Sequence, residues 1–346
     1  NRFKYGISGK WLLNAKNRLI ISGGNRRDVE QTGVSLTVND NVLGRSFASS
    51  ALLASGNSDR LTDINLSTFA IEMEPIKNMT FRLGSSYKTT RSASPTTFSL
   101  SYIDPQAPNG INDRLVQSEV NFSIDMTPGR KTIRHGVERK LVNTDFPRIY
   151  LNYARGVEGL FNSDFNYSRI QLFYRQPFQV GGFGRTFTTF EAGKTYGTVP
   201  LSLLNVVPGN QAYFSIHNTF SQLNFYEFVT DTYASLHVEH NFNGRIFSRI
   251  PFLRKLNLRE IIGIRGVWGE ISQENVDINV PAFQSLPFRG ITPEIIAPNQ
   301  QIYWEYSFGI GNIFKVFRID FNFRGNYRNN IDARKFGVTG AFGFYF

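Results

Sequence analysis

The residues best suited to chemistry lie in the segment Leu236-His-Val-Glu-His240. If this segment is a strand, His237 and Glu239 share one face and His240 lies on the other, because side chains alternate along a strand. An imidazole and a carboxylate could act as an acid–base pair, but two ligands are too few for a closed metal site. The favoured interpretation is a histidine hydrogen-bonded to Glu239 in the interior, and we expect no catalytic residue, metal or cofactor.

Other catalytic patterns are equally weak. The chain contains no cysteine, which excludes disulfides, zinc–thiolate sites and thiol nucleophiles. Gly181-Gly182-Phe183-Gly184 is rich in glycine but is not followed by Lys-Ser/Thr, so it predicts a turn and not a phosphate-binding loop. No nucleophile-elbow motif is present. A hydrolase is therefore the least favoured class of function, and we expect that the protein is not an enzyme.

A second group of polar side chains lies near the C-terminus. Arg318, Asp320 and Arg324 alternate with apolar residues over 317–324, and Glu305 occupies the polar face of 301–310. We expect these four side chains to form one charge cluster inside the protein. The structural interpretation is a charge ladder that fills the interior, and the functional alternative is a pore constriction that selects ions.

The elements that would hold these groups are strands with strict period-two alternation. The clearest runs reach about 9–11 residues, which is the span of a tilted membrane strand, whereas soluble strands are nearer 5–6 residues. The sequence predicts one domain over 1–346, an all-β transmembrane antiparallel up-and-down barrel of about 16 strands, with 14 or 18 as alternatives. The expected strands are 2–13, 17–26, 60–74, 77–90, 94–103, 112–126, 130–139, 146–154, 164–176, 183–196, 210–221, 231–242, 257–269, 300–311, 314–325 and 336–346.

Composition agrees with a barrel in a membrane. Aromatic residues make up 14% of the chain while the mean hydropathy is −0.26, which suits strands with one apolar and one wet face. No run of about 18 apolar residues is present, so a helical membrane protein is excluded. The net charge of +11 is dispersed among apolar residues. It predicts interior and loop cations, or contact with lipopolysaccharide phosphates or an anionic passenger, and no nucleic-acid binding. Outer-membrane lipid and lipopolysaccharide are the expected surroundings of the barrel.

The C-terminal segment 336–346 carries aromatic residues to its last position. It resembles the closing strand of a bacterial outer-membrane barrel, in which Phe342, Phe344 and Phe346 would be the signal read by the barrel assembly machinery. We expect this strand to pair with the first strand near Tyr5, and both termini to lie in the periplasm. No signal peptide is present, so the chain is expected to be a mature form or the C-terminal part of a longer protein.

The links between strands predict a topology. With residue 346 in the periplasm, 312–313 is a short inner turn, and 270–299 and 326–335 are longer outer loops, as such barrels require. Two inner links, 197–208 and 242–256, are longer and partly apolar. We expect them to dock an envelope protein or a lipoprotein. The expected docking residues are Leu203, Leu204, Arg249, Phe252 and Arg254. Residues 39–59 fit no strand, and the side of the membrane on which 27–60 lie stays open.

Several segments carry a family resemblance: 227–237, 240–244, 250–260 and 306–320. They resemble a family of outer-membrane barrels of unknown function from Bacteroidota, whose members typically carry an N-terminal carboxypeptidase-regulatory-like domain. The last three strands are also distantly similar to the barrels of outer-membrane assembly and two-partner secretion, which have about 16 strands. The nearest match to their Arg-Gly-aromatic signature is Phe288-Arg289-Gly290, which Ile291 follows.

These observations favour a non-catalytic barrel in the outer membrane of a Gram-negative bacterium. The resemblance and the two apolar links predict a role in assembling or exporting envelope proteins, or in anchoring a larger complex. A passive diffusion channel is the alternative, and it depends on whether the interior is open.

Overall fold

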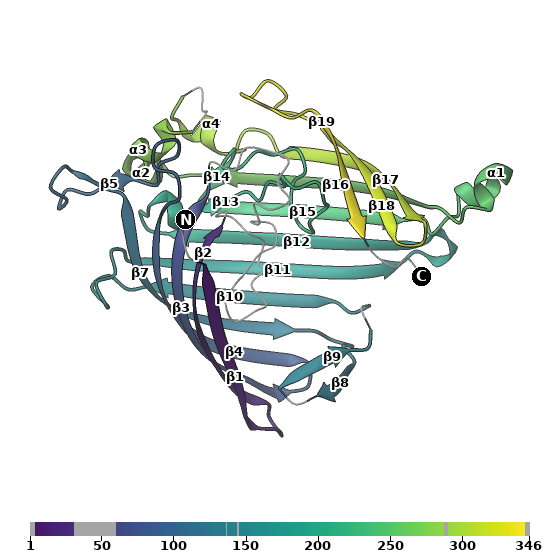
Figure 1. Ribbon diagram of the computed structural model, residues 1–346, viewed down its shortest axis with the longest axis horizontal. Helices are drawn as coiled ribbons and strands as arrows, with labels where there is room; N and C mark the ends of the chain where they lie inside the picture. The colour runs from purple at the N-terminus through teal and green to yellow at the C-terminus, as the bar shows by residue number, and fades with distance from the viewer. Residues whose placement is uncertain (1–3, 31–59, 136, 144, 287–289, 343–346) are drawn as a thin grey trace.

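The computed structural model describes residues 4–30, 60–135, 137–143, 145–286 and 290–342. Its main element is a curved antiparallel sheet of thirteen strands, each paired with the next sheet strand along the chain (Figure 1). In sheet order the strands are β1 (Tyr5–Asn14), β2 (Leu19–Glu30), β3 (Thr62–Ile76), β4 (Met79–Ser92), β7 (Arg114–Met126), β10 (Arg148–Gly156), β11 (Tyr167–Gln179), β12 (Arg185–Tyr196), β15 (Thr232–Asn241), β16 (Arg259–Glu270), β17 (Tyr303–Ile313), β18 (Phe317–Arg324) and β19 (Phe336–Phe342).

The remaining elements are short. Three small antiparallel pairs lie outside the main sheet. They are β5 (Tyr102–Ile103) with β6 (Ile111–Asn112), β8 (Thr132–His135) with β9 (Glu138–Leu141), and β13 (Asn205–Val206) with β14 (Val229–Thr230). The helices are α1 (Pro251–Arg254), α2 (Gln273–Ile278), α3 (Val280–Gln284) and α4 (Pro293–Ile296), and the 3-10 turns are η4 (Gly181–Phe183), η5 (Leu201–Leu203) and η6 (Phe247–Arg249).

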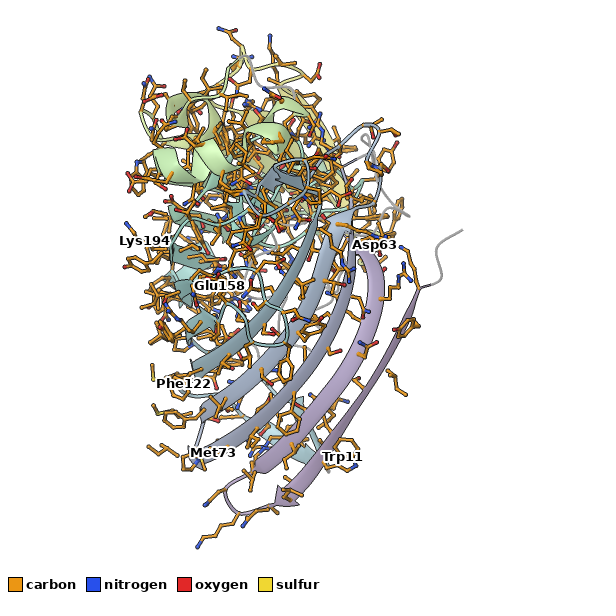
Figure 2. The ribbon with its side chains drawn as sticks, turned by 90° about the vertical axis from the view of Figure 1, so that its left-hand side faces the viewer. Trp11, Asp63, Met73, Phe122, Glu158 and Lys194 are labelled. Carbon is orange, nitrogen blue, oxygen red and sulfur yellow. The ribbon has the colours of Figure 1, made fainter. Side chains whose placement is uncertain are left out.

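The outer face of the sheet is apolar from one edge to the other, because opposed residues on neighbouring strands are apolar on that face. Residues directly opposed in an antiparallel pair lie on the same face. Phe308 opposes Phe321 on one side and Ile262 on the other, and the same face continues to Met126 and Met79. Met73 and Phe122, labelled in Figure 2, belong to this exposed face. The expected alternation is confirmed, and the all-β antiparallel class with it.

The two ends of the sheet differ. One end carries the links 15–18, 77–78, 127–147, 180–184, 242–258 and 314–316, and we call it the turn end. The other carries 31–61, 93–113, 157–166, 197–231, 271–302 and 325–335, and we call it the loop end. The predicted turn near residue 313 and the predicted loops near 271–302 and 325–335 lie at opposite ends, as expected, but the turn end also carries two long links, 127–147 and 242–258.

Three expected wall strands are wrong. Residues 94–103 contain only the end piece β5, 130–139 forms the small hairpin of β8 and β9, and 210–221 lies inside the sheet without a strand of its own. The described sheet consequently has thirteen strands in place of about sixteen. This odd number places Tyr5, where β1 begins, and Phe342, where β19 ends, at opposite ends. The described strands therefore give no support to the expectation that both termini lie on one side, and that expectation stays a prediction.

The sheet is not closed within the described residues. There, β1 forms its ladder with β2, and β19 forms its ladder with β18. The expected pairing of the last strand with the first is not found in these ranges. Phe344, Phe346 and the segment 39–59 lie outside the described residues, as do Phe288 and Arg289 of the Arg-Gly motif.

Residues 197–231 connect β12 to β15 as a single link, and we call them the inner segment. They start at the loop end, enter the concave side of the sheet and return (Figure 1). The sequence predicts that the link 197–208 lies at the turn end, and this is wrong. It lies at the loop end, because 210–221 is not a strand of the main sheet and the chain does not cross the sheet between β12 and β15. Leu203 and Leu204 are only 2% and 4% exposed. They belong to a buried apolar cluster at the loop end, so they are not a docking surface.

Candidate functional site

The side chain of Glu305, on β17, binds the backbone of a turn in the inner segment. Its carboxylate accepts hydrogen bonds from the backbone N–H groups of Ser221 (2.9 Å) and Gln222 (2.8 Å). The Tyr303 hydroxyl donates to the same carboxylate at 2.6 Å. Glu305 is only 1% exposed. A buried carboxylate with three donors is a fixed structural tie, because each donor would otherwise lose a partner.

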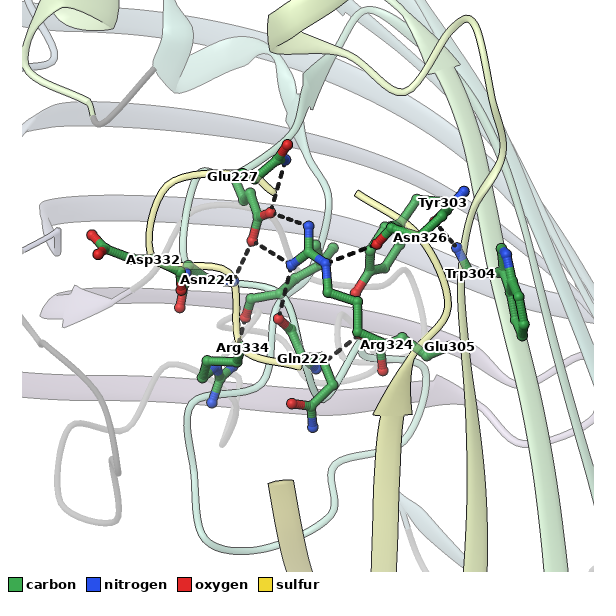
Figure 3. Close-up of polar contacts among 12 residues, drawn as sticks. Gln222, Asn224, Glu227, Tyr303, Trp304, Glu305, Arg324, Asn326, Asp332 and Arg334 are labelled. Carbon is green, nitrogen blue, oxygen red and sulfur yellow. Dashed lines mark hydrogen bonds and ion pairs between the residues drawn. The ribbon is translucent and has the colours of Figure 1, made fainter. Parts of the chain in front are cut away.

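Arg324 of β18 forms the second tie, drawn in Figure 3. Its guanidinium pairs with both carboxylate oxygens of Glu227 at 2.5 and 3.2 Å, and it donates to the Gln222 carbonyl at 3.3 Å. The guanidinium also lies over the Tyr303 ring, 4.9 Å from its centre. Arg324 is only 2% exposed. This two-point charge pair fixes the direction of the inner segment as well as its position.

A third group lies nearer the turn end. Arg318 pairs with both oxygens of Glu239 on β15 (2.9 and 2.7 Å) and with Asp320 (2.7 Å). The Ser215 hydroxyl of the inner segment donates to Asp320 at 2.9 Å and lies 2.8 Å from the Thr339 hydroxyl. The charges of the sheet thus continue directly into the inner segment.

The inner segment also bonds to the last strand through its backbone. Gly340 donates its N–H to the Tyr213 carbonyl (2.8 Å) and accepts from the Ser215 N–H (2.7 Å). These bonds make a parallel bridge between Phe214 and Gly340. The Phe214 ring lies 5.5 Å from the ring of Phe342, centre to centre. The inner segment therefore occupies backbone groups of β19 that its ladder with β18 does not use.

Residues of the loop 325–335 cover the inner segment at the loop end. The Arg334 guanidinium donates to the carbonyls of Asn210 (2.9 Å) and Leu223 (2.7 Å). Burial lowers the pKa of Arg334, and the carboxylates of Glu305 and Glu227 counteract this shift. Asn330 donates to Glu227 at 3.1 Å. The loop and the inner segment therefore form one packed unit.

Two buried asparagines hold the start of the inner segment. Asn275 of α2 accepts from the Val199 N–H (2.8 Å), and Asn279 accepts from the Leu201 N–H (2.6 Å). Asn279 also donates to the Val199 carbonyl at 2.9 Å. Since both asparagines are buried, they replace water as the partners of this backbone.

The four residues of the predicted charge cluster lie on the inner face, but in two separate groups. Glu305, Arg318, Asp320 and Arg324 all lie on the inner face, as the alternation predicted. Arg318 and Asp320 form one group with Glu239, while Arg324 and Glu305 separately hold the inner segment. The four side chains fill the interior and attach the inner segment to it, which is the structural interpretation. The ion-selective constriction gains no support from this geometry.

The predicted partnership of His237 and Glu239 is wrong. Both side chains face inward, but Glu239 pairs with Arg318, and the His237 ring packs 4.8 Å from the Phe220 ring. His240 faces outward, where it contacts Thr186 (2.7 Å) and the Phe183 carbonyl (3.0 Å). Gly181–Phe183 forms the predicted turn. Among the described residues no group of three His, Cys, Asp or Glu side chains could hold a metal ion.

The link 242–258 at the turn end forms an exposed arm, which we call the basic arm. It carries α1 away from the ends of β15 and β16 (Figure 1). Its stems are fixed to neighbouring turns: Arg245 donates to the Gly182 carbonyl (2.7 Å) and Asn312 donates to the Asn257 carbonyl (2.7 Å). Phe252 is 79% exposed.

The basic arm contains no Asp or Glu, and its predicted docking residues Arg249, Phe252 and Arg254 are all exposed. Phe342, the described residue of the predicted C-terminal signal, is 71% exposed and contacts Phe317. These positions agree with the expected surfaces, but docking itself stays a prediction.

Sequence reasoning missed Glu227, Ser215, Asn275 of α2 and Asn279 between α2 and α3. Glu239 shares a face with His237 and could have been assigned to the interior charges from its alternation. No comparable signal exists for Glu227 or Ser215, because the inner segment has no periodicity. Their roles depend on the path of that segment through the interior.

Comparison with known proteins agrees with the fold. Residues 72–276 match the C-terminal domain of a family of unknown function, DUF5686. A crystal structure of BamA from Haemophilus ducreyi lacking POTRA domains 1–3 is similar, with a TM-score of 0.58 and 10% identity. The match covers 98% of this chain and 62% of that one, so the chain spans less than two thirds of the BamA structure. At this identity the likeness shows the fold alone, an outer-membrane β-barrel type.

A weaker match is OccK10 (OpdN) of Pseudomonas aeruginosa, with a TM-score of 0.34, 9% identity, and coverage of 94% of this chain and 82% of that one. A score this low carries no argument. No curated protein sequence matches the chain. None of the helices in the described ranges has the length and apolar character needed to cross a membrane.

Proposed function

The chain belongs to the family of unknown function DUF5686, and we propose that it is a non-catalytic outer-membrane barrel that assembles, exports or anchors envelope proteins. The observation that carries this proposal is the inner segment. Glu305 and Arg324 bind it to the inner face at several points, so the chain itself occupies part of the concave side of the C-terminal half. Surfaces beyond the strand ends are then the places where a partner can act.

The basic arm is the surface that best fits an envelope partner. Arg249, Arg254 and Lys255 are exposed, and the structure gives them no ion pair within the described residues. Ile250 and Phe252 add exposed apolar surface beside them. The arm extends beyond the strand ends, and its exposed cations and apolar side chains fit a protein or lipoprotein with an acidic and apolar surface.

The finer parts of the proposal rest on the sequence resemblance. They are a Bacteroidota origin, a preceding carboxypeptidase-regulatory-like domain, and insertion by the barrel assembly machinery through a signal that ends at residue 346. A diffusion channel is the alternative. The inner segment argues against it, because this segment occupies part of the concave side of the sheet.

Conductance in planar lipid bilayers tests the filled interior. We expect the purified barrel to show no stepwise conductance, because the inner segment stays tied to the wall. Stepwise conductance whose ion preference disappears in the Arg318→Gln/Arg324→Gln variant would support a channel and overturn the proposal.

Photocrosslinking in cells tests the partner. A photoreactive phenylalanine analogue at position 252 should give a stoichiometric crosslink to one envelope protein, and Arg254→Glu/Lys255→Glu should abolish it. The same analogue at Tyr196, exposed at the loop end, is the matched control. Crosslinks that survive charge reversal would argue against the basic arm, and no crosslinked partner from either end would argue against the function.

A further inference from the structure

A groove of about 500 Å³ lies at the turn end, between the β3–β4 turn and the residues that follow β7. It is distant in sequence from the basic arm and the inner segment, and the proposed function does not use it. The groove is lined by Ile76, Lys77, Asn78, Met79, Met126, Pro128, Gly129, Arg130 and Lys131. Three of these residues are cations and none is a carboxylate.

The floor of the groove is the last row of the outer apolar face. Met79 opposes Ile76 on one neighbouring strand and Met126 on the other, so the three side chains lie side by side on that face. The next row along the strands is equally apolar, where Phe81 opposes Met73 and Ile124. The groove therefore opens directly onto the surface that faces the acyl chains of a membrane.

Hydrogen bonds between the two turns fix the shape of the groove. Asn78 accepts from the Thr127 N–H (2.9 Å) through its carbonyl and donates its side-chain amide to the Arg130 carbonyl (3.1 Å). Asn143 braces the other side, because it accepts from the Lys131 N–H (2.8 Å) and donates to the Gly129 carbonyl (3.1 Å). The backbone that carries Arg130 and Lys131 is thus held in place without a ligand.

The cations of the groove are not neutralised by the described residues. The Arg130 Nε atom is buried and has no hydrogen-bond partner there. The nearby carboxylates are already used: Glu74 pairs with Arg139 (2.8 Å) and Asp125 pairs with Arg148 (2.9 Å). Lys77, Arg130 and Lys131 form no ion pair with the described residues and line one groove together. An anion in the groove would therefore serve as their counter-ion.

We propose that this groove binds the phosphate headgroup of an anionic membrane lipid. The phosphate lies between Lys77, Arg130 and Lys131, and the acyl chains follow Ile76 and Met79 onto the outer face. Arginine and lysine at the edge of the hydrocarbon region attract acidic headgroups in this way. The apolar floor favours a lipid over a free phosphate, since inorganic phosphate would leave that floor exposed. The inference assumes the proposed membrane location.

Lipid retention measured by native mass spectrometry tests the site. The full-length barrel is exchanged into mixed micelles that contain phosphatidylglycerol or phosphatidylcholine. We expect selective retention of phosphatidylglycerol, reduced about 25-fold in Arg130→Gln/Lys131→Gln, at roughly fivefold for each cation. Lys16→Gln/Lys315→Gln removes two exposed charges from other turns at the same end and should leave retention unchanged. Folding of each variant is checked separately by its heat-dependent mobility on a gel.

Three outcomes would overturn the proposal: equal retention of both lipids, retention unchanged in the groove variant, or equal loss in the control variant. Inorganic phosphate is added in a separate arm. If it displaces the lipid at equal concentration, the site recognises soluble phosphate and the lipid assignment is wrong. Insertion into lipid nanodiscs is scored independently, so failure of the membrane location is distinguished from failure of the groove.

Discussion

At the loop end the chain buries polar side chains and bonds them to its own backbone, whereas at the turn end it leaves cations and aromatic rings exposed. Asn275 and Asn279 show the first arrangement, because each bonds a backbone group of the inner segment. Phe252 and Phe314, 79% and 91% exposed, show the second. The two ends of one sheet are therefore built for different tasks.

The difference follows from what each end must satisfy. The inner segment has almost no ladder of its own, so its backbone N–H and C=O groups need side-chain partners wherever water is excluded. Glu305 and the asparagines supply them. The links at the other end lie beyond the strands and expose side chains such as Phe252 and Phe314, which are available to contact other molecules. Stability should therefore depend on the loop end, and recognition on the turn end.

The largest effect is expected for Arg324→Met. This variant leaves the Glu227 carboxylate, whose side chain is 8% exposed, without its guanidinium, and removing one partner of a buried ion pair costs about 3–5 kcal/mol. Urea unfolding of the barrel in micelles, followed by tryptophan fluorescence, measures the free energy of unfolding. The double variant Arg324→Met/Glu227→Leu removes both charges and should recover most of the loss. A single variant within about 0.5 kcal/mol of the parent would contradict the tie.

An intermediate effect is expected for Asn279→Ala. The Leu201 N–H and the Val199 carbonyl both lose their partner in a buried site, and unsatisfied groups of this kind cost about 1–3 kcal/mol. The same unfolding measurement applies. Asn17→Ala, in an exposed turn at the other end, is the matched control and should stay within about 0.5 kcal/mol. If both variants lowered the free energy of unfolding equally, stability would not depend more on the loop end than on the turn end.

The sequence predicted the strands of the main sheet better than the inner segment, because apolar and polar residues alternate along the strands. Alternation over 301–324 located β17 and β18 and placed Glu305 and Arg324 on the inner face. The segment 210–221 also alternates locally, but its backbone bonds to Gly340 and to its own turns, which no pattern in the sequence records. Counting it as a wall strand moved Leu203 to the wrong end of the sheet.

Charge partners were predictable only where both lie on strands. Arg318 and Asp320 are two residues apart on one strand, so their shared face follows from alternation. Glu227 reaches Arg324 from a loop, and the distance along the chain gives no indication of that pair. Exposure at the turn end was easier to predict, because 242–258 combines cations and apolar residues without a carboxylate.

The smallest effect on stability is expected for Phe252→Ser in the basic arm. The ring is 79% exposed and loses little contact with the rest of the protein, so the free energy of unfolding should change by less than about 0.5 kcal/mol. The photocrosslinked partner should nevertheless be lost when the analogue is placed at Ile250 of this variant, because the ring is the main exposed apolar group of the arm. Phe228→Ser is the matched control, because its ring is only 1% exposed. It should lower the free energy of unfolding by about 3–5 kcal/mol. A loss above about 1 kcal/mol for Phe252→Ser would mean that the turn end, too, depends on its apolar side chains for stability.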